Sequence, residues 1–401
     1  MTNNKRIRFI VILIGIYSAL IPLENIWAAS FGGSITKYIG LGIMGILCLY
    51  VCRVNNLKLY IGPTTILLIW SLYALISRIW APFPKSNSYA SILINMIVFT
   101  LLLIQYPVTK REMNFIKFAI VIVGVILSFI ILSGNQMVDV NNISGGRVTL
   151  TIGGLVADNN NLAASLCVPI ICSFAFAYSK DVAFKQKILF YSFFAIMVFA
   201  LLMTGSRGGL LALVAGMSVF LLKANGGIKI RTVLLGAFLV LILSFVLQNY
   251  LSAALSSRFT LQSILESGGT GRIEIWKRAL NIFSNSNVFR MLFGYGFGAF
   301  PDVLSHFSGW FVASHNDFIG VLLDLGIFGL VLFLLLWRKM ISHAYSNGKY
   351  TEFGILVAML VSSMSMEMTI KKMFWLAVYL VFVNLIDNEK EIQYENTICN
   401  I

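Results

Sequence analysis

Charged residues are scarce in this chain. Asp, Glu, Lys and Arg make up 11% of its 401 residues, whereas soluble globular domains carry about 25%. Hydrophobic residues reach 58%, and the mean hydropathy is +0.86. The chain also lacks the alternating apolar and polar segments, about ten residues long, that form membrane β-barrels. The composition therefore excludes a water-soluble protein and predicts an all-α integral membrane protein.

Apolar runs recur along the whole chain, and most approach the length of about 20 residues that an α-helix needs to cross a bilayer. No soluble domain separates them, so we expect one polytopic membrane domain over residues 1–401. The runs predict twelve membrane spans: 9–26, 35–52, 60–78, 89–106, 115–133, 160–178, 187–204, 208–222, 232–250, 317–337, 352–367 and 372–386.

The positions of Lys and Arg predict the orientation of these spans, because cytoplasmic loops are enriched in both residues. With both termini in the cytoplasm, most of the basic residues fall in or beside inside loops: Lys5, Arg6, Arg8, Arg53, Lys58, Lys110, Arg111, Lys117, Lys180, Lys185, Lys187, Lys223, Lys229, Arg231, Arg338, Lys339, Lys349 and Lys390. The net charge of +14 is therefore a signal of topology, and we expect no nucleic-acid partner.

The first apolar run has a second interpretation. Basic residues precede it and the small residues Ala28 to Ser30 follow it, which also fits a cleaved signal peptide. We interpret the run as a first span, because the basic loops then all fall on the cytoplasmic side without any other change to the topology.

Cysteine and histidine are also scarce. None of the five cysteines falls in a predicted outside loop, so no disulfide framework is expected. Only three histidines are present, and the outside loops hold no cluster with the three or four ligands of a metal site. We therefore expect chemistry without a metal or another cofactor.

Two outside segments are long, at residues 134–159 and 251–316. The second lies between the ninth and tenth spans and is the largest hydrophilic stretch of the chain. Function is expected at this extracytoplasmic face, because loops commonly carry it. Within the second segment, residues 270–284 predict an amphipathic helix. Its expected apolar face is Ile273, Trp276, Ala279, Leu280 and Phe283.

Three arginines of the outside face are candidates for binding an anion. Arg207, in TGSRGG, lies where two spans meet almost without a loop, and the glycines there permit a tight turn. Arg147 lies in GGRVTL and Arg272 in GTGRIEIW. A guanidinium can bind a phosphate through two hydrogen bonds. The alternatives are a snorkelling arginine at position 207 and solvated or ion-paired arginines at 147 and 272.

The sequence DNNNLA, residues 158–163, follows Arg147 and predicts a capped helix start, which would also favour an anion.

His315, in ASHND, is a candidate general base just before the tenth span. Imidazole titrates near neutral pH and can accept a proton from a hydroxyl. Asn316 and Asp317 are expected to orient it, and the alternative is a structural histidine. Asp324 lies nine residues further on, roughly 13 Å along a helix and too far for contact. It is interpreted as a paired carboxylate, with substrate binding or a proton path as alternatives.

These motifs occur in a fixed order over residues 145–335: GGR with DNNNLA, TGSRGGLLAL, TGRIEIW, GYGFGAF and ASHNDFIGVLLDLGIFGL. Together they resemble the O-antigen ligase and polymerase family of bacterial membrane glycosyltransferases. The resemblance implies a helical fold of the GT-C kind in the bacterial cytoplasmic (inner) membrane. It also implies a role in lipopolysaccharide or other polysaccharide biosynthesis.

The resemblance implies an undecaprenyl-diphosphate-linked oligosaccharide as the donor, and possible control by a chain-length regulator protein. By motif, Arg207, Arg272 and His315 match functional residues of the family, and Arg147 matches in part. Three hypotheses follow: a polymerase of lipid-linked repeat units, a ligase that transfers a finished glycan to lipid A core or another acceptor, and a flippase or transporter. Polar residues that concentrate at one face favour the two enzymes over the transporter.

Overall fold

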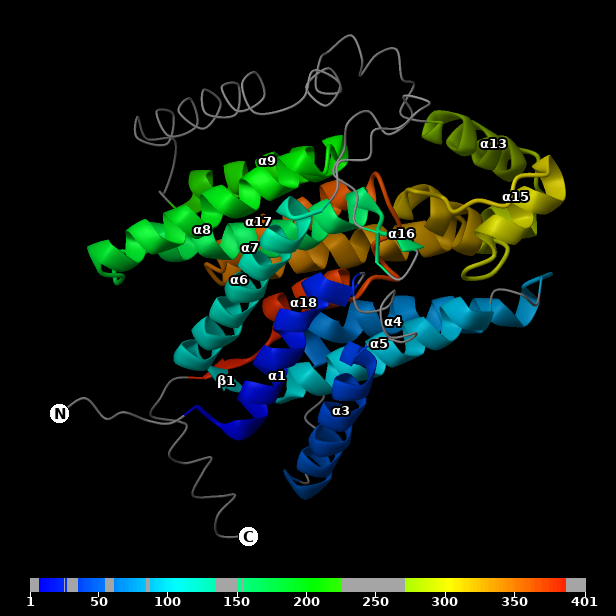
Figure 1. Ribbon diagram of the computed structural model, residues 1–401. Helices are drawn as coiled ribbons and strands as arrows, with labels where there is room; N and C mark the ends of the chain where they lie inside the picture. The colour runs from blue at the N-terminus through cyan, green and yellow to red at the C-terminus, as the bar shows by residue number, and fades with distance from the viewer. Residues whose placement is uncertain are drawn as a thin grey trace.

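The computed structural model describes residues 7–24, 26, 35–54, 61–83, 87–134, 151–152, 155–224 and 271–386. These residues form a bundle of helices with two very short sheets (Figure 1). The helices of the first half are α1 (Phe9–Leu20), η1 (Ile21–Leu23), α3 (Ile35–Val54), α4 (Ile61–Ile76), η2 (Ser77–Trp80), α5 (Asn87–Gln105), α6 (Lys110–Leu132), α7 (Asn159–Tyr178), α8 (Phe184–Met203) and α9 (Arg207–Ala224).

The second half continues after the next described residue, Gly271. Its helices are α13 (Arg272–Ser284), α14 (Val288–Phe293), α15 (Phe300–Ser308), α16 (Asp317–Ser346), α17 (Tyr350–Ser363) and α18 (Lys372–Phe382). Two strand pairs complete the elements: β1 (Val108–Thr109) lies parallel to β4 (Leu385–Ile386), and β2 (Thr151–Ile152) lies antiparallel to β3 (Leu155–Val156).

The predicted all-α membrane fold is confirmed. Six helices in the described part of the chain are long and apolar enough to cross a membrane, namely α3, α6, α7, α8, α9 and α16. Five shorter apolar segments correspond to α1, α4, α5, α17 and α18. Each of the other predicted spans corresponds to a helix, and the predicted span 232–250 lies outside the described residues. The count of twelve spans and the GT-C topology therefore stay predictions.

Ion pairs gather the ends of several helices at one end of the bundle. Arg8, just before α1, pairs with Glu112 in the first turn of α6 at 2.6 Å. Lys117 of α6 pairs with Glu352 in the first turn of α17. The end of α18 lies here too, because β4 pairs with β1. We call this the basic end of the bundle. Its location in the cytoplasm stays a prediction.

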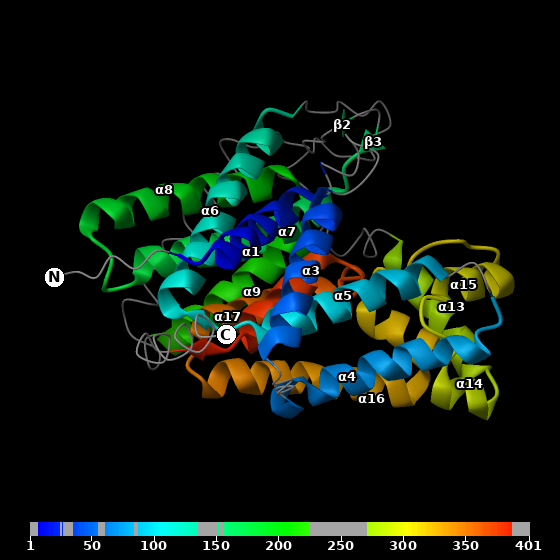
Figure 2. The ribbon, with the colours of Figure 1, turned by 90° about the horizontal axis from the view of Figure 1, so that it is seen from below.

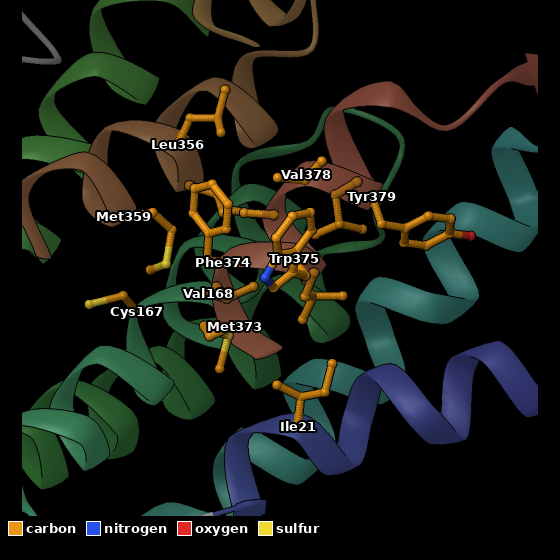
Figure 3. Close-up of a cluster of buried hydrophobic side chains, with 14 of the residues drawn as sticks. Ile21, Cys167, Val168, Leu356, Met359, Met373, Phe374, Trp375, Val378 and Tyr379 are labelled. Atoms are coloured by element: carbon orange, nitrogen blue, oxygen red, sulfur yellow. The ribbon is translucent and has the colours of Figure 1, made fainter. Parts of the chain in front are cut away.

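Helix α18 lies at the centre of the bundle. Every residue from Met373 to Phe382 is buried, as expected for a helix that is hydrophobic on all sides. Figure 3 shows Phe374 and Trp375 among side chains of α7, α17 and η1. The Trp375 indole N–H donates to the Thr369 carbonyl at 2.9 Å, so this buried ring keeps a partner for its polar atom.

Helix α16 is interrupted at Gly326, where the sequence predicted one continuous span. Gly326 has φ 68° and ψ −170°, a conformation open essentially to glycine alone. Near the break, the carbonyl of Leu323 accepts from the backbone N–H of Tyr295 at 3.1 Å, and the carbonyl of Asp324 accepts from that of Gly296 at 2.7 Å. The turn after α14 thus satisfies backbone groups that the break frees, as a membrane interior requires.

The side chain of Asp324 belongs to the same arrangement. Its Oδ2 accepts a hydrogen bond from the Gly298 backbone N–H at 2.7 Å. Tyr73 of α4 donates its hydroxyl to the Leu325 carbonyl at 2.9 Å. Asp324 Oδ2 thus has a backbone partner, whereas its buried Oδ1 has no hydrogen-bond partner among the described residues. In Figure 2, helices α13, α14 and α15 gather beside one end of α4 and α16.

We predict that Gly326→Ala destabilises the protein. A Cβ at this position would lie 2.4 Å from the backbone of Leu292, and the backbone strain alone costs about 1–3 kcal/mol. The matched control is Gly45→Ala in α3, where a Cβ meets nothing within 4 Å. Thermal unfolding of both variants in detergent measures the difference. Equal unfolding temperatures would contradict the strain argument.

Candidate active site

The N-termini of α7 and α9 lie side by side, at the end of the bundle opposite the basic end. The Ser206 hydroxyl donates to Asn160 Oδ1 at 2.9 Å. The amide of Asn159 donates to the carbonyl of Thr204 at 3.1 Å. A Cβ on Gly209 would lie 2.4 Å from Ala163, so glycine at this position allows the two helices to approach closely. We call this the site end.

Arg207 and Asp158 occupy the first positions of these two helices. Arg207 is the first residue of α9, follows a tight turn at Thr204 to Ser206 as predicted, and is partly exposed. Asp158 caps α7 and accepts from the backbone N–H of Asn160 at 2.7 Å, which confirms the predicted helix start. Two adjacent helix N-termini present partial positive charge. This part of the surface is therefore suited to an anion.

Arg272 opens α13, and the predicted amphipathic helix is confirmed over Arg272–Ser284. The predicted apolar face is partly wrong. Ile275 and Ala279 are buried, whereas Ile273 and Leu280 are 42% and 45% exposed. Apolar residues surround a wide arc of α13, so the packing partners decide which stripe is covered. Here α15 and α16 cover the stripe that contains Ile275 and Ala279.

His315 lies in a tight turn directly before α16, with a left-handed φ of 49°. Asn316 caps α16, and its Oδ1 accepts from the Phe318 backbone N–H at 2.9 Å. Asp317 accepts from the hydroxyl of Thr369 at 2.9 Å. These side chains therefore hold the backbone of the turn that carries His315, and the expectation that they orient the imidazole stays a prediction. Within the described residues, that ring makes no recorded hydrogen bond.

Four charged groups from three segments lie near His315. Burial lowers the pKa of His315, and the nearby Arg272 lowers it further. Glu367 and Asp158 act in the opposite direction, and Lys371 acts in the same direction as Arg272. His315 is partly buried, so these charges act through a medium less screening than bulk water. The imidazole is therefore mostly neutral at pH 7.

Arg272 is placed in the same cluster. Burial lowers the pKa of its guanidinium, and the negative charge of Asp158 partly offsets that effect. Asp158 thus interacts with both Arg272 and His315. The structure brings Arg272 and His315 together, and it places Arg207 at the same end beside α7. Arg147 lies outside the described residues and stays a predicted site residue.

Two charged residues of this cluster were missed from the sequence. Glu367 and Lys371 lie in the connection between α17 and α18, about fifty residues beyond His315 and outside every quoted motif. Glu367 Oε1 accepts hydrogen bonds from Ser314, from the backbone N–H at 2.7 Å and from the hydroxyl at 2.8 Å. The available signal was a short connection between two spans that contains these two charged residues.

No group of three His, Cys, Asp or Glu side chains that could hold a metal occurs among the described residues. The fold and the site together define an all-α membrane protein in which charged groups of both signs lie near a histidine at one end of the bundle.

Residues 192–334 match the family model described as O-antigen ligase. This segment contains Arg207, Arg272, His315 and the glycine-rich turn on α16. The resemblance to the O-antigen ligase and polymerase family is thereby confirmed, and it indicates a membrane enzyme that resembles glycosyltransferases. A comparison of the chain with curated proteins finds no match.

We predict that His315 titrates below the ordinary histidine value of about 6.5. Diethyl pyrocarbonate modifies neutral imidazole, so His315 should stay reactive at pH values where a model histidine peptide no longer reacts. In Arg272→Gln the midpoint should rise, because a positive charge that disfavours imidazolium is removed. Mass spectrometry of the modified peptide measures both midpoints.

His343 provides an internal control, since it lies near Phe382 at the basic end. Its modification should be the same in both proteins. An unchanged His315 midpoint in Arg272→Gln would show that the two groups do not interact.

Proposed function

We propose that this protein polymerises polyprenyl-diphosphate-linked oligosaccharide repeat units at the outer face of the bacterial cytoplasmic membrane. The observation that carries the proposal is that Arg272, at the start of α13, lies near His315 at one end of a membrane helix bundle. The match of residues 192–334 supports this general class of activity.

The proposed reaction needs a cationic site for its leaving group. The bond between the anomeric carbon and the diphosphate oxygen breaks, and its electron pair stays on the diphosphate. Fixed guanidinium groups stabilise that charge as it develops. Arg207 and Arg272 are proposed for this role, with Arg147 as a further binding residue. Lys371 adds a cation that the motifs did not indicate.

His315 is the proposed general base. It accepts the proton of the attacking sugar hydroxyl while the hydroxyl oxygen bonds to the anomeric carbon. A base must be unprotonated to act, and the lowered pKa of His315 supplies that form near pH 7. One displacement of this kind inverts the anomeric configuration. No metal or other cofactor takes part in these steps.

A ligase is the second candidate, and the description of the matching family model names this activity. The same arginines and histidine would release the same leaving group. The acceptor would then be lipid A core or another surface molecule instead of a second lipid-linked repeat unit. A chain-length regulator is a proposed partner for the polymerase only.

We predict that His315→Ala lowers the rate of glycan transfer by about 10²–10⁴-fold, the usual contribution of a general base. Loss of one arginine, in Arg207→Ala or Arg272→Ala, should lower it by about 10²–10³-fold. All three proteins should reach the membrane in normal amounts. Transfer by the purified variants, assayed with lipid-linked repeat units, measures the effect.

The matched control is Arg338→Ala, because this arginine is exposed on the half of α16 that leads to the basic end. It should transfer glycan at the wild-type rate. A wild-type rate in His315→Ala would remove the proposed base.

Purified protein supplied only with undecaprenyl-diphosphate-linked repeat units distinguishes the two candidates. A polymerase should produce a ladder of longer lipid-linked chains, since both substrates are present. A ligase should produce nothing until lipid A core is added. Transfer to lipid A core without chain lengthening would therefore replace the polymerase with the ligase.

A further inference from the structure

We propose that Trp276 is a positioning residue that sets the geometry between Arg272 and His315. Its indole N–H ties α13, which carries Arg272, to the turn that carries His315. The inference rests on the proposed function, because it concerns how the proposed leaving-group site and the proposed base are kept together.

The tie is a single hydrogen bond. Trp276 Nε1 donates to the carbonyl oxygen of Ser314 at 2.9 Å. This carbonyl belongs to the peptide group that joins Ser314 to His315. Its orientation is coupled to the backbone of His315, which has the left-handed φ of 49°. A bond to this oxygen therefore acts directly on the placement of the imidazole.

Ser314 is held from its other side as well. Its backbone N–H and its hydroxyl both reach Glu367 Oε1, at 2.7 and 2.8 Å. The residue is fully buried. Glu367 thus fixes Ser314 to the connection between α17 and α18, and Trp276 fixes α13 to Ser314. The indole links the candidate anion-binding helix to this anchored residue.

Helix geometry extends the effect of Trp276 to Arg272. The two residues are four positions apart in α13, so they lie on one face and about 6 Å apart along the axis. Fixing Trp276 to the His315 turn directs the same face toward that turn. This explains why Arg272, the first residue of α13, lies close enough to His315 to lower the pKa of its imidazole.

A purely structural role is the competing explanation, because Trp276 also packs against the cluster of Ile275, Ala279 and Phe300. Trp276→Phe keeps an aromatic ring there and removes the N–H donor. Incorporating benzothienylalanine at position 276 keeps the two-ring shape and replaces only the N–H by sulfur. This second variant addresses the hydrogen bond even if the phenylalanine protein folds poorly.

The experiment measures transfer from undecaprenyl-diphosphate-linked repeat units by the purified full-length protein. Both Trp276 variants should lower kcat by between about 10-fold and 100-fold, because small misplacements of reacting groups have effects of this size. The acid limb of the pH–rate profile should move to higher pH, since Arg272 would no longer lie as close to the imidazole. A structural role alone would not move that limb.

A double-mutant cycle with Arg272→Lys tests whether Trp276 acts through Arg272. In the Arg272→Lys protein, Trp276→Phe should lower kcat much less than in the wild type. The control is Trp310→Phe, which removes another indole of the same region. Trp310 stacks on Arg278 at 4.2 Å and makes no recorded hydrogen bond to the turn, so kcat should stay unchanged.

The outcomes distinguish failure of the positioning role of Trp276 from failure of the proposed function. If Arg272→Ala is inactive while both Trp276 variants keep the wild-type kcat and pH profile, the positioning role is wrong and the proposed function stands. The same conclusion follows if Trp276→Phe has an equal effect in both backgrounds. If Arg272→Ala retains full transfer activity, the proposed function fails, and the inference fails with it.

Discussion

Hydrogen bonds between the start of α16 and the connection from α17 to α18 hold the candidate site together. Asp317 accepts from the backbone N–H of Met368 and the hydroxyl of Thr369, both at 2.9 Å. Glu367 accepts in turn from Ser314. A carboxylate within a bundle is costly without such partners. The connection and the turn therefore cannot separate without leaving acids unsatisfied, and the left-handed backbone of His315 is fixed as a result.

The interruption of α16 also helps to position the candidate site. The residues that satisfy the broken helix, Tyr295 to Gly298, follow α13 in the chain, with only the short helix α14 between them. Docking this segment onto α16 limits where α13 can lie. The break in the span and the position of Arg272 are therefore consequences of one packing arrangement. The glycine-rich turn GYGFGAF, residues 294–300, resembles a phosphate-binding loop only in its sequence. Its contact with Asp324 explains why it contains glycine.

The sequence predicted the features that depend on composition and on local chemistry. The lengths of the apolar runs predicted the helices, and Asp158 predicted the start of α7. The sequence could not predict the break at Gly326, because a glycine within an apolar run does not reveal its backbone angle φ. Nor could it choose between Ile273 and Ile275 as the buried side of α13, since the partner helices decide this. Glu367 joined the site through tertiary contacts alone, and such contacts leave no motif.

The charge balance around His315 links the base to the donor in the proposed mechanism. Arg272 and Lys371 lower the pKa of the imidazole, and Glu367 and Asp158 raise it. A diphosphate bound at Arg272 would add negative charge on the side that now carries the positive charge, so the pKa of His315 would rise. A higher pKa makes the unprotonated imidazole a stronger base. The histidine would thus gain basicity only when the leaving group is in place, and a hydroxyl approaching an empty site would meet a weaker base.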